Sequence, residues 1–455
     1  MLVPLTLLLL AAPPPAAPST FESIVGRALT DGATLATVTD LADRIGPRLS
    51  GSDGAAEAVR WAVAEFQAAG VPVRTERVKV ARWVRGEERG EVLPGPGRRG
   101  GPLVLTALGG SAPTPPGGVE AEVVEVTSLE ALATAPVQGR IVYFHHRMSS
   151  WEGYNAAAEL RSYGPAKAAA RGAVATMVRS VATGSLRSPH TGAASFGSGD
   201  RSIPAVALAT EDAEEIHRWL QAGPVRVRLQ LGCRIEPDVD SANVVGEIRG
   251  RDKPQEVVLL GAHLDSWDLA VGAQDDGAGV AMVLETARLL ARMRPGPRRS
   301  VRFVLFMNEE NGGAGAHAYA DAHAGELHVG ALEVDAGAGR PLWVYFRGGE
   351  GAESLLAPLL RPLAALGVDP TPRRHTLFGQ DLKALAQKRG LPTLHLWQDP
   401  AHYFDVHHSA ADTLDKIDPV ALAQSAAATA WLTWSLADAA GTLVPPPIEP
   451  PAPVR

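Results

Sequence analysis

The chain has 455 residues, of which 45% are hydrophobic and 20% are charged, and its formal net charge is −7 at pH 7. This length predicts two or three domains, and the acidic net charge argues against a nucleic-acid partner. Cys233 is the single cysteine, which excludes an intramolecular disulfide bond and a cluster of thiolate ligands. Any bound metal must therefore have nitrogen and oxygen ligands.

Residues 1–17 predict a signal peptide. Their apolar core of about ten residues is too short to span a bilayer, and Ala16 and Ala17 are typical of a cleavage site. The alternative is a disordered or buried N-terminus, because no Lys or Arg precedes the apolar core. No later apolar run reaches about 18 residues, so we expect no other membrane span. These features predict a secreted or periplasmic protein.

Residues 18–118 predict helices followed by strands. Apolar residues recur at helical spacing, with gaps, over Glu22–Gly70. Alternating apolar residues then predict a strand at Val71–Trp83, and a second strand is expected at Leu103–Leu108. A run rich in proline and glycine at 112–118 predicts a domain boundary.

Residues 119–240 predict a separate small α/β domain inserted into the first. Short apolar strands surround a helical segment near Tyr163–Arg171. The sequence S-P-H-T-G at Ser188–Gly192 predicts a loop. This loop lies either at the surface, at a domain interface, or close enough to a catalytic site for His190 to take part.

The first indication of a metal site lies in residues 257–290. Val257–Leu260 predicts a strand buried on both faces, and His263 and Asp265 follow at its carboxyl end. A loop then carries Asp275 into the sequence D-D-G-A-G, which opens a helical pattern. Imidazole and carboxylate groups at the carboxyl edge of a parallel strand lie where open α/β sheets bind their ligands.

Two further strands end in carboxylates. The apolar segment Val301–Phe306 leads to Glu309 and Glu310, and Gly330–Asp335 ends at the carboxylate of Asp335. A strand–helix–strand unit is right-handed and brings the carboxyl ends of its parallel strands to one edge. Two Glu at a strand end are more often solvated, but neighbouring carboxylates at a sheet edge require a cation or a retained proton.

The last motif is H-Y-F-D-V-H-H-S-A-A-D-T-L-D at His402–Asp415, which follows a predicted helix near Asp381–Arg389 and a strand at Thr393–Trp397. It supplies His407 and His408 as candidate ligands. Residues 241–440 complete the domain begun at 18–118, with a closing helix at Val420–Leu436, and the proline-rich residues 441–455 predict a disordered tail.

Taken together, the motifs supply one imidazole for each of two metals and a carboxylate to lie between them. The candidate ligands are His263, Asp275, Glu310, Asp335 and His408. Two metals roughly 3.5–4 Å apart, bridged by a carboxylate and a water, form a hydrolytic centre. Oxygen ligands with one His per metal suit zinc, with cobalt or manganese as substitutes. Glu309, which is adjacent to a ligand, is the candidate general base.

On these motifs the chain resembles the co-catalytic di-zinc exopeptidases, a family that includes bacterial leucine aminopeptidases and glutamate carboxypeptidases. The resemblance extends over almost the whole chain after residue 17, including H-L-D-S-W-D at His263–Asp268 and S-P-H-T-G at Ser188–Gly192. It implies an α/β fold with a mixed, mostly parallel sheet sandwiched by helices and with an inserted protease-associated domain. It also implies hydrolysis of dipeptides or short peptides by a zinc-bridging hydroxide, with Glu309 as general base.

The resemblance implies a role for each candidate ligand. His263 and Asp335 would hold one zinc ion, Glu310 and His408 would hold the other, and Asp275 would bridge the two. His408 is preferred to its neighbour because the ligand of this family lies four residues before the Asp of the D-T pair.

Other roles follow from the same resemblance. The Asp265 side chain would orient the ring of His263, and the peptide bond Asp275–Asp276 is expected to be cis. The candidate substrate contacts are His190, Tyr403 and Asp381. The resemblance further implies a homodimer.

Two alternatives remain open. A glutaminyl cyclase-like acyltransferase has the same fold with one zinc ion, and the complete ligand set argues against it. A non-catalytic, receptor-like binding protein would be expected to lack ligands that this chain retains.

Overall fold

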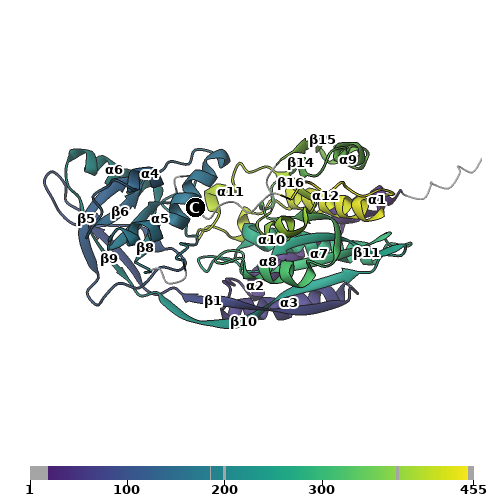
Figure 1. Cartoon of the computed structure of the whole chain (residues 1–455), viewed down its shortest axis with the longest axis horizontal. Coiled ribbons are helices and arrows are strands. Elements are labelled where there is room, and N and C mark those ends of the chain that lie inside the picture. The colour runs from purple at the N-terminus through teal and green to yellow at the C-terminus, as the bar shows by residue number, and fades with distance from the viewer. Residues whose placement is uncertain (1–18, 185, 198–200, 376–378, 449–455) are drawn as a thin grey trace, which may run out of the picture.

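A computed structural model describes residues 19–448 apart from residues 185, 198–200 and 376–378, and the strands within this part of the chain form two mixed sheets. The predicted signal peptide at residues 1–17 lies outside the described residues. Figure 1 shows that the two sheets belong to two units placed side by side along the long axis. We call residues 19–84 and 234–448 the first unit and residues 85–233 the second unit.

The first unit is built on a sheet whose central strands are parallel. Its strands, in their order across the sheet, are β1 (Val73–Val84), β10 (Arg234–Ile248), β12 (Arg299–Phe306), β11 (Lys253–His263), β13 (Leu327–Glu333), β16 (Thr393–Gln398), β14 (Pro341–Arg347) and β15 (Asp369–Arg374). The neighbours β12, β11, β13 and β16 run parallel, so their carboxyl ends meet at one edge. The fold class predicted from the sequence is confirmed.

Helices cover both faces of this sheet. They are α1 (Thr20–Thr30), α2 (Ala33–Arg44), α3 (Asp53–Ala68), α7 (Ala278–Ala291), α8 (Ala314–His323), α9 (Ala352–Leu360), α10 (Gln380–Arg389) and α12 (Pro419–Asp438). The short helix α11 (Tyr403–Val406) instead packs against the second unit through Phe404. In β11, Val258 and Leu260 pack in the core that contains α7 and α12. Leu259 between them packs in the opposite core with α8 and α10. Burial on both faces explains why this strand is uniformly apolar.

The second unit has its own sheet. Its strands, in order, are β3 (Gly101–Pro102), β2 (Glu88–Val92), β9 (Arg226–Leu231), β5 (Val119–Val126), β6 (Ile141–Phe144), β7 (Ala175–Arg179), β8 (Ala205–Leu208) and β4 (Leu105–Ala107). Its helices are α4 (Leu129–Leu132), α5 (Tyr154–Ala170) and α6 (Thr210–Ala222). Short helical turns in the chain are η1 (Trp151–Gly153), η2 (Ala273–Gly277), η3 (Arg361–Leu366) and η4 (Leu414–Lys416).

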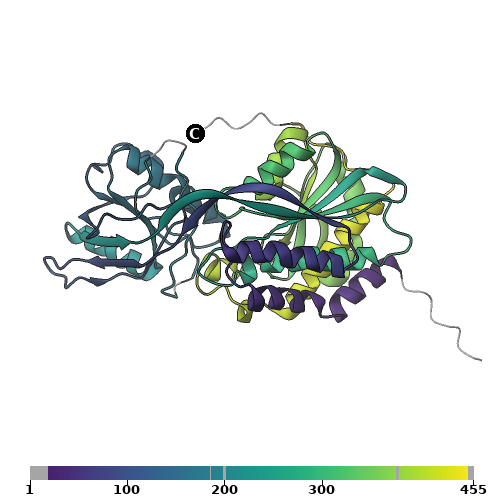
Figure 2. The ribbon, with the colours of Figure 1, turned by 90° about the horizontal axis from the view of Figure 1, so that it is seen from below.

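A two-stranded ribbon joins the units. Strands β1 and β10 pair in antiparallel register from Val73 opposite Gly246 to Val84 opposite Arg234. Figure 2 shows this ribbon running from the first sheet to the base of the second unit. The chain therefore enters and leaves the second unit through neighbouring strands.

The domain boundaries differ from those expected at 119 and 240. Strands β2, β3 and β4 belong to the second sheet, because β2 pairs with β9 and β4 pairs with β8. Long-range pairing of this kind leaves no local signal, and the proline-rich run at 112–118 joins two strands of one sheet. The likeness of the second unit to a protease-associated domain stays a prediction.

The C-terminal segment is ordered for longer than expected. Leu443 is buried in the main core, and the N–H of Gly349 donates to the carbonyl of Val444 at 2.7 Å. The predicted disorder of 441–455 is therefore wrong for the part up to residue 448, because apolar contacts and backbone bonds hold it. Within the described residues, no helix is both long and apolar enough to cross a membrane.

Candidate metal centre and catalytic site

The candidate site lies at the carboxyl edge of the central strands. His263 is the last residue of β11, Glu309 and Glu310 follow β12, and Asp335 follows β13. His408 comes from the segment after β16, just beyond α11. Because these strands are parallel neighbours, side chains far apart in the sequence converge there.

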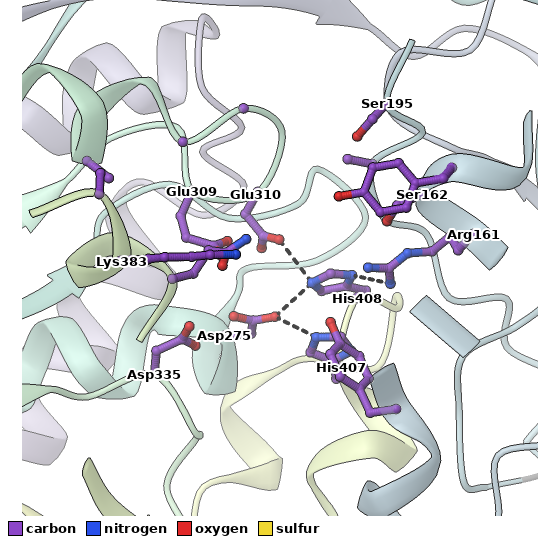
Figure 3. A pocket seen from close by; sticks show the side chains of 18 of the residues that line it. Arg161, Ser162, Ser195, Asp275, Glu309, Glu310, Asp335, Lys383, His407 and His408 are labelled. Atoms are coloured by element: carbon purple, nitrogen blue, oxygen red, sulfur yellow. Dashed lines mark hydrogen bonds and ion pairs between the residues drawn. The ribbon is translucent and has the colours of Figure 1, made fainter. Parts of the chain in front are cut away.

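Asp275 lies at the middle of the cluster. Its Oδ1 is 3.1 Å from Nε2 of His263, and its Oδ2 is 3.1 Å from Nε2 of His408. His263 Nε2 is also 3.6 Å from Oδ1 of Asp335, and His408 Nε2 is 2.9 Å from Oε2 of Glu310. Figure 3 shows Asp275 beside His408, Glu310 and Asp335. The structure thus brings together all five predicted ligands.

Burial and mutual contact shift the pKa values of this cluster. Burial opposes a charged imidazole, yet the carboxylates of Asp275 and Asp335 raise the pKa of His263 well above its usual value. In the same way, Glu310 and Asp275 outweigh burial and raise the pKa of His408 to about 9. Burial raises the pKa of Glu310. The cluster concentrates negative charge and draws positive charge towards it.

Glu309 faces the same centre, and its carboxyl group forms no ion pair with another described residue. Burial, with further contributions from Asp335 and Glu310, raises the pKa of the Glu309 carboxyl group well above its usual value. The side chain lies beside the cluster in Figure 3 and lines a cavity of about 530 Å³. It is therefore a carboxyl group within reach of both the cluster and a molecule in the cavity.

The loop that carries Asp275 is held from several sides. The Asp275–Asp276 peptide bond is cis, as predicted. Asp412 accepts from the backbone N–H groups of Gln274 at 2.7 Å and Asp275 at 3.1 Å. Asp412 therefore positions the Asp275 backbone.

Asp276 and Gly279 complete this support. The carboxylate of Asp276 accepts from the backbone N–H of His263 at 3.2 Å and from that of Gly279 at 3.0 Å. A Cβ on Gly279 would lie 2.1 Å from the carbonyl oxygen of Val334. The glycine lets α7 approach the end of β13 closely, which explains its place in D-D-G-A-G.

Asp265 does not make the contact expected of its side chain. Nδ1 of His263 hydrogen bonds to the backbone carbonyl of Asp265 at 2.9 Å, whereas its carboxylate Oδ1 is 4.0 Å away. That oxygen instead accepts from the N–H groups of Asn308 at 2.7 Å and Glu309 at 3.1 Å. Asp265 therefore shapes the turn that carries Glu309.

Two adjacent histidines face the centre. The rings of His407 and His408 stack at 3.6 Å, and His407 Nε2 is 3.4 Å from Oδ2 of Asp275. His408 has a φ of 61°, which breaks the alternation that would send neighbouring side chains to opposite sides. The contact of His408 with Glu310 distinguishes it from His407.

The three candidate substrate contacts fall in different places. Tyr403 lines the cavity. His190 is 3% exposed and is not among the cavity-lining residues, because its Nδ1 bonds to the carbonyl of His407 at 2.5 Å. Asp381 is buried beside Glu333, and it too is absent from the cavity wall. His190 and Asp381 therefore lie outside the cavity wall, and direct contact of the three residues with substrate stays a prediction.

Both units line the cavity. The first unit supplies Glu309, Glu310, Asp335, Tyr403 and His408, and the second unit supplies Tyr154, Arg161, Ser162 and Ser195. An adjoining cavity of about 490 Å³ shares part of this wall and is lined by several aromatic side chains. Trp151 of the second unit meets Trp397 of the first there, with ring centroids 4.7 Å apart. The site is thus a cleft between the units.

The sequence did not identify three residues that support the candidate site. Arg48 is fully buried and donates to the carbonyls of Leu264, Val271 and Gly272. Glu333 accepts from the N–H of Leu382 at 3.0 Å, and burial raises its pKa to about 8. Arg161 reaches the site from the second unit. None of the three belongs to a recognisable motif. For Arg48 alone the sequence offers a signal, because Gly46–Pro47 just before it interrupts the helical pattern.

Comparisons with known proteins point to one family. Residues 243–433 match peptidase family M28. Carboxypeptidase Q from Mus musculus is 35% identical over 404 residues, which cover 88% of this chain and 84% of that protein. The crystal structure of a peptidase M28 precursor from Shewanella amazonensis SB2B has a TM-score of 0.88 and 37% identity, covering 94% of this chain and 98% of that one. A zinc aminopeptidase from Bacillus subtilis shares the fold, with a TM-score of 0.63, 21% identity and coverage of 89% and 94%.

Proposed function

The chain belongs to peptidase family M28, and from this premise we propose that it is a zinc-dependent exopeptidase that hydrolyses dipeptides or other short peptides. The observation that carries the proposal is the position of Asp275 between His263 and His408. Each of these imidazoles also contacts a second carboxylate, so the cluster has the composition of a paired metal site.

The protein groups fit two zinc ions. The donor atoms are imidazole nitrogen and carboxylate oxygen, which zinc accepts. Oε1 of Glu310 is buried and has no hydrogen-bond partner within the part of the chain that the structure describes, which supports a cation beside it. We assign His263 and Asp335 to one ion, Glu310 and His408 to the other, and Asp275 to both. The positive charge of the metals would replace the protons that the carboxylates otherwise draw to the imidazoles.

Zinc supplies Lewis-acid activation of water and of the scissile carbonyl. The protein residues supply orientation and proton transfer. The backbone N–H of Glu309 donates a hydrogen bond to the carboxylate of Asp265, which positions the residue. The Glu309 side chain would accept a proton from the attacking water and deliver it to the leaving amine. The peptide would lie in the cavity between the units, where Tyr403 forms part of the wall.

The test is a panel of dipeptides, free and blocked at either end, with zinc-loaded wild-type protein and Glu309→Gln. We expect cleavage of unblocked dipeptides by wild type and loss of cleavage in the variant, with zinc content unchanged. Equal rates would contradict Glu309 as the base. Failure of zinc-loaded wild type to cleave any peptide would contradict the proposed function and favour a cyclase or a binding protein.

Export of the chain and its assembly as a homodimer stay predictions. The signal peptide at residues 1–17 would direct the protein to a secreted or periplasmic location, where peptides with free ends are available as substrates. Size-exclusion chromatography with light scattering would measure the oligomeric state.

A further inference from the structure

The second unit contains a group of metal-binding side chains outside the candidate metal centre. Glu125 is on β5, His145 directly follows β6, and His217 is on α6. Each residue offers one ligand atom, and the three atoms lie within 4.8 Å of one another. Figure 1 shows these elements at the end of the second unit that lies farther from the first unit. We call these three residues the second-unit cluster.

Hydrogen bonds hold the three elements of the second-unit cluster together. Strands β5 and β6 are parallel neighbours, and the N–H of His145 donates to the carbonyl of Val126 at 3.0 Å, which extends their pairing. The hydroxyl of Tyr143 donates to the carbonyl of Ala213 at 2.8 Å, about one turn of α6 before His217. The sheet and this bond to the helix therefore set the relative positions of the cluster residues.

The ligand atoms of the cluster have the separation that zinc requires. Nδ1 of His217 lies 2.8 Å from Oε2 of Glu125, and Nδ1 of His145 lies 3.9 Å from Oε1 of the same carboxylate. Ligands about 2.0–2.1 Å from a tetrahedral zinc ion are about 3.3–3.4 Å apart. The two distances lie on either side of this value, so a small rotation of the side chains would let all three bind one ion.

The charge of Glu125 also indicates a cation. Its side chain is 17% exposed, and its ionic partners among the described residues are the two histidines of the cluster, with no lysine or arginine. The rings of His145 and His217 stack with their centroids 4.3 Å apart, so positive charge on both rings would be repulsive. One metal ion bound to both rings would neutralise the carboxylate without that repulsion.

Glu214 makes the outer contact that is typical of a metal-bound histidine. Its Oε1 lies 3.3 Å from Nε2 of His145 and accepts from Nε of Arg179 at 2.9 Å. Although burial opposes it, hydrogen bonds from Arg147, His145 and Arg179 lower the pKa of Glu214 to about 2, so Glu214 accepts as a carboxylate. Metal-bound histidines usually donate their second ring N–H to such a group, which leaves Nδ1 of His145 for the ion.

We propose that Glu125, His145 and His217 bind a zinc ion that links α6 to the sheet of the second unit. Two imidazole nitrogens and a carboxylate oxygen suit zinc, whereas magnesium and calcium prefer oxygen ligands alone. The side chain of His217 is 32% exposed, so water can supply the fourth ligand. This ion is additional to the two assigned to the candidate metal centre, and its binding does not depend on the proposed peptidase function.

The role of the ion is to stabilise the second unit. None of the three side chains lines the two cavities between the units, so the ion does not face a molecule bound there. Its ligands come from two strands and a helix that are separate in the sequence. An ion that binds only when these elements are folded together shifts the unfolding equilibrium towards the folded state.

The test counts the zinc ions bound by wild type, His217→Gln and His146→Gln. Each protein is equilibrated with zinc in excess over all candidate sites, and the bound zinc is measured by elemental analysis after free zinc is removed. We expect His217→Gln to bind one ion fewer per chain than wild type. His146→Gln is the matched control, because it removes a neighbouring imidazole that lies outside the cluster, and it should bind as many ions as wild type.

Two further measurements sharpen the test. Glu214→Gln should weaken binding of this ion by about 10- to 100-fold, as measured by competition with a chelator, because residues that orient ligands typically have this effect. Anomalous X-ray diffraction at the zinc edge should show a peak between Glu125, His145 and His217 in zinc-equilibrated wild type and none there in His217→Gln.

Three results would overturn the proposal. The first is equal zinc content in wild type and His217→Gln, and the second is the absence of an anomalous peak at the cluster in zinc-equilibrated wild type. The third is a loss of one ion in His146→Gln as well, since this would show that the loss does not report the cluster.

Discussion

His263 is oriented by the backbone of Asp265 and not by its side chain. The ring Nδ1 bonds to the Asp265 carbonyl at 2.9 Å, while the nearest carboxylate oxygen is 4.0 Å away. The carboxylate instead accepts hydrogen bonds from two backbone N–H groups of the turn that carries Glu309. Asp265 thus supports a candidate metal ligand through its carbonyl and the candidate base through its carboxylate.

This division of roles predicts a difference between two variants. Asp265→Ala leaves the two N–H groups of the turn without an acceptor, at a cost of about 1–3 kcal/mol, so kcat should fall about 10- to 100-fold. Asp265→Asn keeps an acceptor oxygen and should retain most zinc binding and activity. Kinetics and zinc titration measure both. A 10- to 100-fold loss of zinc affinity in Asp265→Asn would instead show that the carboxylate orients the ring.

Asp412 should govern metal affinity without touching a metal. Its carboxylate accepts hydrogen bonds from the backbone N–H groups of Gln274 and Asp275, so Asp412→Ala should displace the carboxylate of Asp275, the proposed bridge between the metals. We expect a loss of zinc affinity of about 10- to 100-fold, as is typical for residues that support ligands. Asp415→Ala is the control, since its side chain is 70% exposed. Competition titration with a zinc chelator measures the affinities, and equal values in both variants would contradict this role.

Gly279 should not tolerate a side chain. Its Cβ would lie 2.1 Å from the Val334 carbonyl oxygen, and the backbone there cannot move without displacing β13. Gly279→Ala should therefore destabilise the fold by about 3 kcal/mol. Gly26→Ala, in α1, meets no atom within 4 Å and should stabilise by about 0.5–1 kcal/mol. Thermal unfolding of both variants tests the contrast, and equal midpoints would contradict it.

His328 predicts acid sensitivity at a point remote from the candidate site. Burial, helped by the charge of Arg302, lowers the pKa of His328 to about 4. The unfolded chain, with a pKa near 6.5, binds more protons between these values, so stability falls as the pH falls from about 6.5 to 4. The contribution is at most about 1.4 kcal/mol per pH unit. His328→Gln should flatten the pH dependence of the thermal midpoint across this window, and an unchanged slope would contradict the assignment.

Much of the site follows from the sequence because its ligands end parallel strands. Once Val257–Leu260 and Val301–Phe306 are read as neighbouring strands, His263 and Glu310 must meet at one edge. Family resemblance then supplies the pairing of ligands. The geometry of Asp265 could not be predicted, because a side chain and its own carbonyl compete for the same imidazole within a single turn.

Interactions between the units were beyond sequence reasoning for a different reason. Arg161 lies in a helix that spans Tyr154–Ala170 with Pro165 inside it, although apolar spacing predicted only a segment near Tyr163–Arg171. The helix lacks a clear apolar face because one side packs on the second sheet and another borders the cleft. Similarly, the charged sequence of β2 does not indicate which sheet it belongs to. Its place in the second sheet is set by its pairing with β9, which is distant in the sequence.

The ribbon of β1 and β10 has an evolutionary consequence. Val84 and Arg234 are paired across it, so the second unit, which we call the cassette, begins and ends at neighbouring positions. A hairpin turn of two to five residues could close the gap in its place. The histidines and carboxylates of the centre would all remain on the scaffold, while Arg161 would leave with the cassette. A single excision would therefore separate the candidate metal ligands from the side chains that the second unit contributes to the cavity wall.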